Sequence, residues 1–287
     1  VFKNGSMEKI IHKGKQDPHS LTMTESNQHK SIGDSLSQLI EIVEKLRAPG
    51  GCPWDRDQTQ ASLLPYFLEE IYEVIESVEE GNMELLKEEL GDILLHVVFQ
   101  ASIGKENKDF TLQDSLNCVN EKLVRRHPHV FADAKAEGPF HAKQNWEAAK
   151  HDEKKRESRL DGVPGTLPAL TRSQRLQEKA SYAGFDWKKV EQVWEKVHEE
   201  IGELKEAEEK GVAQQIEEEI GDTLFSIVNL SRFLGVSAET ALRKTNRKFT
   251  ARFSLVEEEL KKRGKTVEDS SLEEMDEIWN VIKNCTD

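Results

Sequence analysis

The chain has 287 residues, of which 36% are hydrophobic and 33% are charged, and its formal net charge is -14 at pH 7. Such a composition is typical of a globular protein with a heavily ionised surface, and the acidic balance argues against nucleic acid or an anionic membrane as the main partner. No apolar run approaches membrane-spanning length, and the three widely spaced cysteines indicate reduced thiols instead of disulfides or a zinc site. We therefore expect a cytoplasmic protein.

The first half of the chain begins with a tail and continues in helices. Residues 1–31 show no apolar periodicity and contain a Gly-Ser-Met step, so we expect a disordered tail or a remnant of cloning there. Beyond it, apolar residues recur at helical spacing and no segment shows convincing strand alternation. Stripes of this kind cover residues 67–78, 86–101 and 112–123. Because Gly81 and Asn82 leave only a short connection, the first two stripes predict an antiparallel helix pair.

The second half repeats this order after a charged connector. The connector is a helical stretch over residues 144–159, and the Gly and Pro residues of segment 161–168 (DGVPGTLP) cannot continue it. Helical stripes follow at residues 190–204, 216–233, 238–260 and 272–282. We predict an all-α protein with an N-terminal domain over residues 32–160, connector included, and a C-terminal domain over residues 161–287.

Acidic residues match between the two halves position by position. The segment 69–73 (EEIYE) corresponds to 199–203 (EEIGE), and 88–95 (EELGDILL) corresponds to 218–225 (EEIGDTLF). Every acidic position in these segments recurs at the same offset along the chain. A repeat of this kind indicates an internal duplication and predicts two tandem helical bundles.

Four carboxylates of the first half are predicted to surround one point. Glu70 and Glu73 share a helix face because residues three apart do, and Glu89 and Asp92 share a face of the next helix. Like charges about 4 Å apart repel by roughly 1 kcal/mol in water and by more near protein, so the cluster needs a cation. An all-oxygen shell selects a hard ion, Mg²⁺ or Mn²⁺. The second half repeats the arrangement with Glu200, Glu203, Glu219 and Asp222.

A simpler interpretation is that these Glu-rich helices are solvated surfaces with ion pairs along them. A single Glu-x-x-Glu in so acidic a chain favours that interpretation. Two acidic pairs on adjacent helices, repeated at a constant offset in the second half, favour the metal sites. His96 lies one turn beyond Asp92 and could join the site, but its counterpart in the second half is Ser226, so we expect His96 to have a packing role.

Cations and tryptophans flank both predicted metal sites. The following helix carries Lys122 and Arg126 in the first half, and Asn246, Lys248 and Arg252 in the second. Lys and Arg four residues apart can meet one anion, although such cations also balance acidic neighbours on a surface helix. Trp54 and Trp187 each precede the first metal helix, where a Trp either anchors the core or stacks on a base. Arg175 and Lys179 are weaker candidates, because an amphipathic helix places such cations outward by default.

Four further motifs accompany the carboxylate pattern: residues 50–55 (GGCPWD), 126–131 (RHPHVF), 167–170 (LPAL) and 184–187 (GFDW). Together with Glu-Glu-x-x-Glu followed by Glu-x-x-Asp, they resemble the MazG family of all-α nucleoside triphosphate pyrophosphohydrolases. The resemblance runs from about residue 36 to the C-terminus. It implies two tandem MazG-like helical-bundle domains, hydrolysis of a nucleoside triphosphate to the monophosphate and pyrophosphate, assembly as a homodimer, and a role in nucleotide-pool cleaning or stress modulation.

The resemblance also implies roles for individual residues. In the C-terminal copy, which is usually the more active one in two-domain relatives, the Mg²⁺ ligands that carry catalysis would be Glu200, Glu203, Glu219 and Asp222. Their N-terminal counterparts as ligands would be Glu70, Glu73, Glu89 and Asp92. The substrate would be contacted by Asn246, Lys248, Arg252 and Trp187, and in the first copy by Lys122 and Arg126. The alternatives are a metal-binding regulatory module without catalysis, and a ferritin-like di-metal protein, which is disfavoured because those proteins use Glu-x-x-His pairs.

Overall fold

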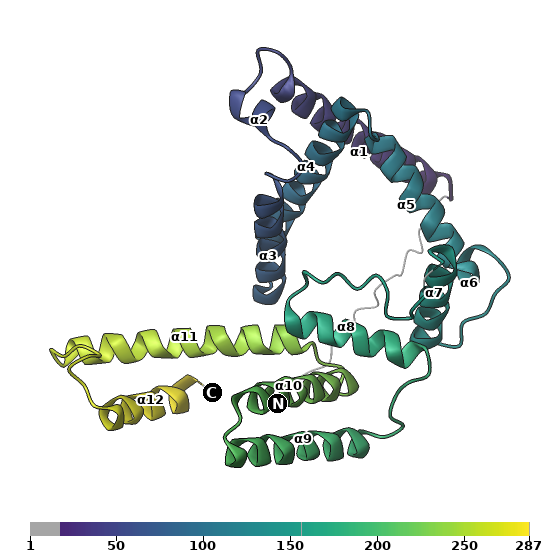
Figure 1. Cartoon of the computed structure of the whole chain (residues 1–287). Coiled ribbons are helices and arrows are strands. Elements are labelled where there is room, and N and C mark those ends of the chain that lie inside the picture. Colours follow the sequence, from purple (N-terminus) through teal and green to yellow (C-terminus); the bar gives the residue numbers. More distant parts are fainter. Residues whose placement is uncertain (1–17, 156, 287) are drawn as a thin grey trace, which may run out of the picture. The chain divides into compact units, whose positions relative to one another are not determined.

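The protein is helical throughout the part of the chain that its computed structural model describes, residues 18–155 and 157–286 (Figure 1). The helices of the first half are α1 (Pro18–Arg47), α2 (Pro53–Asp57), α3 (Leu64–Glu80), α4 (Met83–Asn107), α5 (Leu112–Arg126) and α6 (Pro128–Phe131). Those of the second half are α7 (Pro139–Glu153), α8 (Ala169–Tyr182), α9 (Val190–Lys210), α10 (Ala213–Phe233), α11 (Ala238–Lys262) and α12 (Leu272–Thr286). No strand occurs in these described ranges, and the predicted all-α class is confirmed.

The described helices form two compact units, Val1–Val124 and Arg125–Asp287. Helix α7 packs on α8, so the charged connector belongs to the second unit. The domain boundary that we placed after residue 160 describes the sequence repeat and stays a prediction. Of the expected tail, residues 1–17 lie outside the described residues, and α1 begins at Pro18.

The first unit is built on the antiparallel hairpin of α3 and α4. Gly81 ends α3 with φ 70°, a left-handed conformation that glycine adopts without steric cost. The side chain of Asn82 then caps α4 by accepting a hydrogen bond of 3.2 Å from the backbone N–H of Leu85. Helix α1 covers this hairpin through α4, and the buried core between them consists of Val43, Leu63, Val98, Phe99 and Ile103.

The second unit contains a matching hairpin of α9 and α10, turned by Gly211 with φ 68°. Helix α8 packs on α10, where Gln177 Nε2 donates a hydrogen bond of 2.8 Å to the backbone oxygen of Phe225. Helices α11 and α12 form a second hairpin with its own small core of Val256, Leu260 and Ile278. Among the described residues, none of the helices combines the length and the hydropathy of a membrane-spanning segment.

Candidate metal centres

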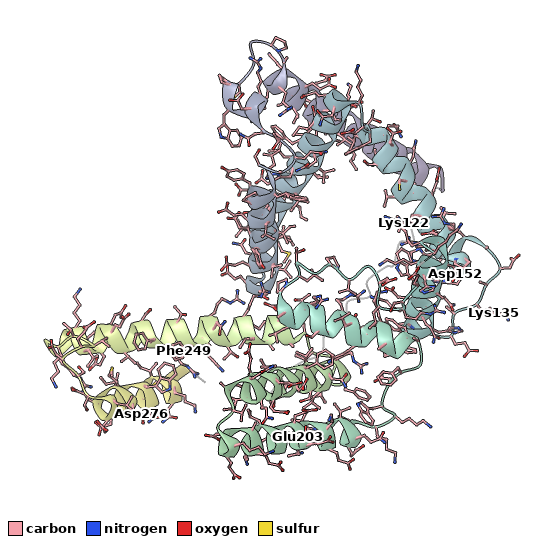
Figure 2. The ribbon with its side chains drawn as sticks, in the orientation of Figure 1. Lys122, Lys135, Asp152, Glu203, Phe249 and Asp276 are labelled. Atoms are coloured by element: carbon pink, nitrogen blue, oxygen red, sulfur yellow. The ribbon has the colours of Figure 1, made fainter. Side chains whose placement is uncertain are left out.

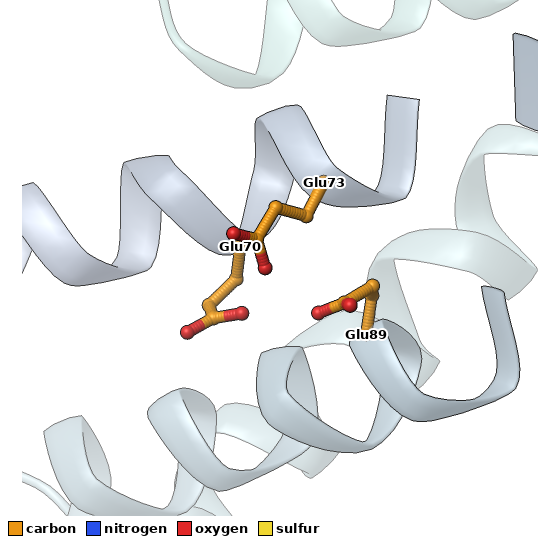
Figure 3. A group of neighbouring side chains, drawn as sticks. All are labelled: Glu70, Glu73 and Glu89. Carbon is orange, nitrogen blue, oxygen red and sulfur yellow. The ribbon is translucent and has the colours of Figure 1, made fainter. Parts of the chain in front are cut away.

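Three carboxylates converge between α3 and α4. Glu70 and Glu73 extend from α3, and Glu89 extends toward them from the facing helix α4 (Figure 3). Each offers one oxygen, and these oxygens all lie within 4.8 Å of one another. The seam of the hairpin buries Glu89, half-buries Glu70 and leaves Glu73 exposed. The α3–α4 cluster, as we call these three residues, is therefore a partly buried, all-oxygen set of ligand atoms.

Crowding of the α3–α4 cluster changes its titration. Burial, together with the neighbouring carboxylates of Glu73 and Glu70, raises the pKa of Glu89 to about 7, and burial is the largest of these causes. Burial also raises the pKa of Glu70, with Asp92 and Glu73 adding repulsion. The raised pKa values mean that three negative charges so close together are unfavourable unless a cation offsets them. Oxygen ligands that repel one another in this way suit a hard divalent ion such as Mg²⁺.

The α9–α10 hairpin carries the matching cluster. Glu200, Glu219 and Asp222 bring one oxygen each within 4.8 Å of one another, and Glu200 is buried. We call these residues the α9–α10 cluster. Burial raises the pKa of Glu219, and the charges of Glu203 and Asp222 are the next largest causes. The α9–α10 cluster thus offers the same hard-cation chemistry as the α3–α4 cluster.

Each cluster gathers three of the four predicted ligands. Asp92 is outside the mutually close group on α3–α4, and Glu203 is outside the group on α9–α10, although each raises the pKa of a clustered neighbour. Four carboxylates at one point repel one another, and a change of rotamer moves one of them away. The residue outside the group differs between the copies: Asp222, the counterpart of Asp92, is clustered, and so is Glu73, the counterpart of Glu203. Both positions can therefore supply a ligand. Binding of one ion by all four carboxylates stays a prediction.

Lys196 belongs to the α9–α10 site, and the sequence analysis missed it. Its Nζ lies 2.7 Å from Glu199 Oε1 and 2.7 Å from Glu200 Oε1. Hydrogen bonds to these two carboxylates raise the pKa of Lys196, Glu199 having the larger effect. The available signal was its position one helical turn before Glu200, where an opposite charge shares the same face. The corresponding residue before Glu70 is Tyr66.

The predicted phosphate-binding residues lie in different environments. On α11, Asn246 and Lys248 are exposed and Arg252 is buried. Lys122 is half-buried on α5 (Figure 2), whereas Arg126 is buried and ion-paired with Glu153. The Arg126 guanidinium also lies 5.1 Å from the centre of the Trp146 ring. The roles of these five residues as phosphate contacts stay predictions.

The aromatic and histidine candidates have clearer outcomes. Trp54 is 52% exposed and Trp187 is 44% exposed, so neither is a core anchor within the described structure. His96 is buried and stacks on Phe67 with ring centres 5.3 Å apart, as expected for a packing role. Its Nε2 lies 4.0 Å from Glu70 Oε1, but burial lowers the pKa of His96 and so disfavours a charged pair.

The expectation that Lys179 points outward was wrong. Helix α7 covers this part of α8, and the buried Lys179 Nζ lies 3.3 Å from Glu147 Oε2, which is also buried. Burial alone would raise the pKa of Glu147, but Lys150, Lys179 and Arg175 together lower it. The amphipathic pattern of α8 could not reveal this contact because α7 comes from a separate part of the sequence.

Comparison with known proteins agrees with the duplicated architecture. The family model for the MazG nucleotide pyrophosphohydrolase domain matches residues 58–131 and again residues 188–256. The chain is 50% identical over 256 residues to the nucleoside triphosphate pyrophosphohydrolase/pyrophosphatase MazG of Thermotoga maritima, covering 88% of this chain and 98% of that protein. It is 43% identical over 256 residues to the nucleoside triphosphate pyrophosphohydrolase of Escherichia coli K12, covering 87% and 97%. Both matches of the domain model contain one of the carboxylate clusters, and the chain belongs to the MazG family.

Proposed function

We propose that the protein hydrolyses nucleoside triphosphates to nucleoside monophosphates and pyrophosphate in a reaction that depends on Mg²⁺, for which Mn²⁺ can substitute. The observation that carries the proposal is the pair of carboxylate clusters, each within a matched MazG domain. The relatives from Thermotoga maritima and Escherichia coli are both named as nucleoside triphosphate pyrophosphohydrolases. An acidic chain can hold a polyanionic substrate only where cations offset its charge, and the clusters are suited to bind such cations.

The carboxylates of each cluster, completed by Asp92 and Glu203, would hold the ion. When bound, Mg²⁺ neutralises triphosphate oxygens and lowers the pKa of a coordinated water. No side-chain nucleophile is needed, because water attacks the α-phosphorus and pyrophosphate leaves from the opposite side. Lys196 already reaches Glu200, so its ammonium can turn to a phosphate oxygen beside the same carboxylate.

The C-terminal copy is our choice for the main active site. It carries Lys196 next to its carboxylates, and its predicted phosphate residues Asn246 and Lys248 are exposed. Trp187 is also exposed and available to a base. The N-terminal copy keeps all of its acidic residues, and we expect it to hold metal with a lower contribution to turnover.

Exposed apolar side chains support the proposal that the protein is a homodimer. On α3 and α4 these include Leu64, Leu68, Ile71, Leu90 and Leu94, and on α9 and α10 they include Ile201, Ile220, Leu224, Phe225 and Ile227. An outward row of large apolar residues on a two-helix hairpin is a face that a second helical hairpin can cover. Pairing of equivalent hairpins from two copies would form four-helix bundles beside the metal clusters.

We place the activity in the cytoplasm, as nucleotide-pool cleaning or stress modulation. The competing proposal is a regulatory module that holds metal without catalysis, and it predicts Mg²⁺ binding with no turnover. A second activity follows from the name of the Thermotoga maritima relative, which includes pyrophosphatase. A site that binds Mg²⁺ and the phosphates of a nucleotide offers the same contacts to free pyrophosphate, so hydrolysis of pyrophosphate to phosphate is our second candidate.

The test is to incubate the whole chain with each common nucleoside triphosphate and Mg²⁺ and to separate the products. We expect nucleoside monophosphate in amounts equal to the triphosphate consumed, and EDTA should stop its formation. The monophosphate is the decisive readout, since a pyrophosphatase activity would convert pyrophosphate to phosphate. A variant combining Glu89→Gln and Glu219→Gln serves as the control for contaminating hydrolases. Formation of nucleoside diphosphate, or no turnover across the panel, contradicts the proposal.

A further inference from the structure

The two copies differ at one position beside the metal cluster. Lys196 precedes Glu200 by one helical turn, and Tyr66 precedes Glu70 by one helical turn at the equivalent point of α3. Residues four apart on a helix share a face, so both side chains lie beside their clusters. The ion pair of 2.7 Å between Lys196 and Glu200 shows directly that this position reaches the first carboxylate. The position one turn before the first carboxylate is therefore an ammonium group in the C-terminal copy and a phenol ring in the N-terminal copy.

Tyr66 is paired with a second ring. The rings of Tyr66 and Trp54 are in edge-on contact, with centres 5.8 Å apart and an interplanar angle of 75°. Tyr66 is 45% exposed, and Trp54 also keeps about half of its surface open to solvent, although aromatic rings are normally buried when a core position is available. The N-terminal copy thus has one exposed ring a helical turn before Glu70 and a second exposed ring in contact with the first. The C-terminal copy has Trp187 as an exposed ring but Lys196 in place of the second.

Arg47 fixes the segment that carries Trp54. Arg47 Nη1 donates to the backbone oxygens of Asp55, at 2.5 Å, and of Gln58, at 3.3 Å. Its other nitrogens donate to both carboxylate oxygens of Glu106, each at 2.7 Å. Gln58 Nε2 in turn donates to the backbone oxygen of Trp54 at 3.0 Å. The buried side chain of Arg47 therefore holds the short helix α2, which carries Trp54, in place. A ring that is already fixed loses little conformational entropy when a ligand stacks on it.

We propose that Tyr66 and Trp54 form a nucleobase platform, through which the N-terminal copy selects its nucleotide by the base, whereas Lys196 makes the C-terminal copy select by the phosphates. A nucleobase is the ligand class because it offers an aromatic face while its triphosphate reaches the carboxylate-bound metal. Stacking on one aromatic side chain is worth about 1–3 kcal/mol for any base, so the platform would favour nucleotides over base-free polyphosphates with little preference among bases.

The test compares two ligands in two versions of the whole chain. Glu200→Gln with Glu219→Gln leaves only the N-terminal site, and Glu70→Gln with Glu89→Gln leaves only the C-terminal site. Calorimetry with Mg²⁺ then measures the Kd of an adenosine triphosphate analogue with an imido group between the α- and β-phosphorus, and the Kd of inorganic tripolyphosphate, which has no base. The proposal takes its ligand from the proposed function, but the measurement needs no hydrolysis, so a failed hydrolysis assay and a failed platform are distinguishable.

In the N-terminal-only protein, Tyr66→Leu should raise the nucleotide Kd by roughly 5- to 150-fold and leave the tripolyphosphate Kd within about twofold. The matched variant Tyr66→Phe keeps the ring and should leave both values within about twofold. In the C-terminal-only protein, Lys196→Gln should raise both values by similar factors, because both ligands present phosphates.

Three results would overturn the proposal. The first is a nucleotide Kd that Tyr66→Leu does not change, and the second is an equal loss of affinity for nucleotide and tripolyphosphate. The third is an N-terminal-only protein that binds no nucleotide at all. Light scattering of each variant supplies the remaining check, because a change of oligomeric state without a change in the ratio of the two Kd values would assign Tyr66 to a subunit contact and reject the platform.

Discussion

Replacement of Arg47 by Met should destabilise the first unit far more than loss of an ordinary surface ion pair. Met keeps the aliphatic part of the side chain and removes the guanidinium. The Arg47 side chain is only 5% exposed. The lost hydrogen bonds leave the backbone oxygens of Asp55 and Gln58 without their charged donor, and Glu106 without its partner. A hydrogen bond from a charged group is worth about 1.5–3 kcal/mol, and the half-exposed Glu106 pair adds no more than about 1 kcal/mol. We therefore expect a loss of about 2–4 kcal/mol.

The matched control is Lys105→Met, which removes a second ion pair between α1 and α4. Lys105 Nζ lies 2.7 Å from Glu44 Oε1, but its side chain is 63% exposed and, within the described part of the chain, donates to no backbone oxygen. Its loss should cost less than about 1 kcal/mol. Urea unfolding followed by circular dichroism measures both variants, and hydrogen exchange over residues 47–64 locates the change. Equal losses in the two variants, or unchanged exchange around Trp54 in Arg47→Met, would refute the assignment of Arg47 as the anchor of α2.

Further predictions concern the clusters and the α7–α8 contact. Asp222→Ala should lower activity by more than about 100-fold, since it removes a metal ligand, and Asp92→Ala should cost less; the reverse order in a steady-state assay would move the main active site to the N-terminal copy. With EDTA, the raised pKa of Glu89, about 7, means that its stabilising proton is fully present below about pH 4.5 and is lost through pH 7, so thermal stability should fall as pH rises across that window. Mg²⁺ should oppose the fall and Glu89→Gln should abolish it, and a melting temperature in EDTA that rises over the same window would contradict the cluster geometry. Lys179→Met leaves Glu147 buried without its nearest cation and should cost about 3 kcal/mol in urea unfolding; a loss below about 1 kcal/mol would show that the pair is solvated.

The hairpins and the clustered carboxylates could be predicted from local rules. Gly81 and Asn82 mark the turn between α3 and α4 because glycine tolerates the left-handed conformation and asparagine caps the next helix. The three-residue spacing of Glu70 and Glu73 then places both carboxylates on one face. Repetition of the same pattern at a constant offset distinguishes these residues from the many other glutamates of the chain.

The contacts that were missed depend on rotamers and on distant segments. Periodicity predicts the helix faces of Asp92 and Glu203 but not the rotamers, which leave these two carboxylates outside the mutually close groups. The burial of Lys179 requires α7 to cover α8, which the pattern of α8 alone does not contain. The contact of Lys196 with Glu200 could be predicted from the sequence, because the two residues have the four-residue spacing of a helical ion pair.

Hydrolysis in water enriched in oxygen-18 tests the proposed chemistry most directly. The whole chain is incubated with adenosine triphosphate and Mg²⁺, the products are separated, and their masses are measured by mass spectrometry. Attack of water on the α-phosphorus predicts one oxygen-18 atom in the adenosine monophosphate and none in the pyrophosphate first released. The variant combining Glu89→Gln and Glu219→Gln should form neither product. Label in the pyrophosphate with unlabelled monophosphate, or release of adenosine diphosphate and labelled phosphate, would contradict water attack at the α-phosphorus.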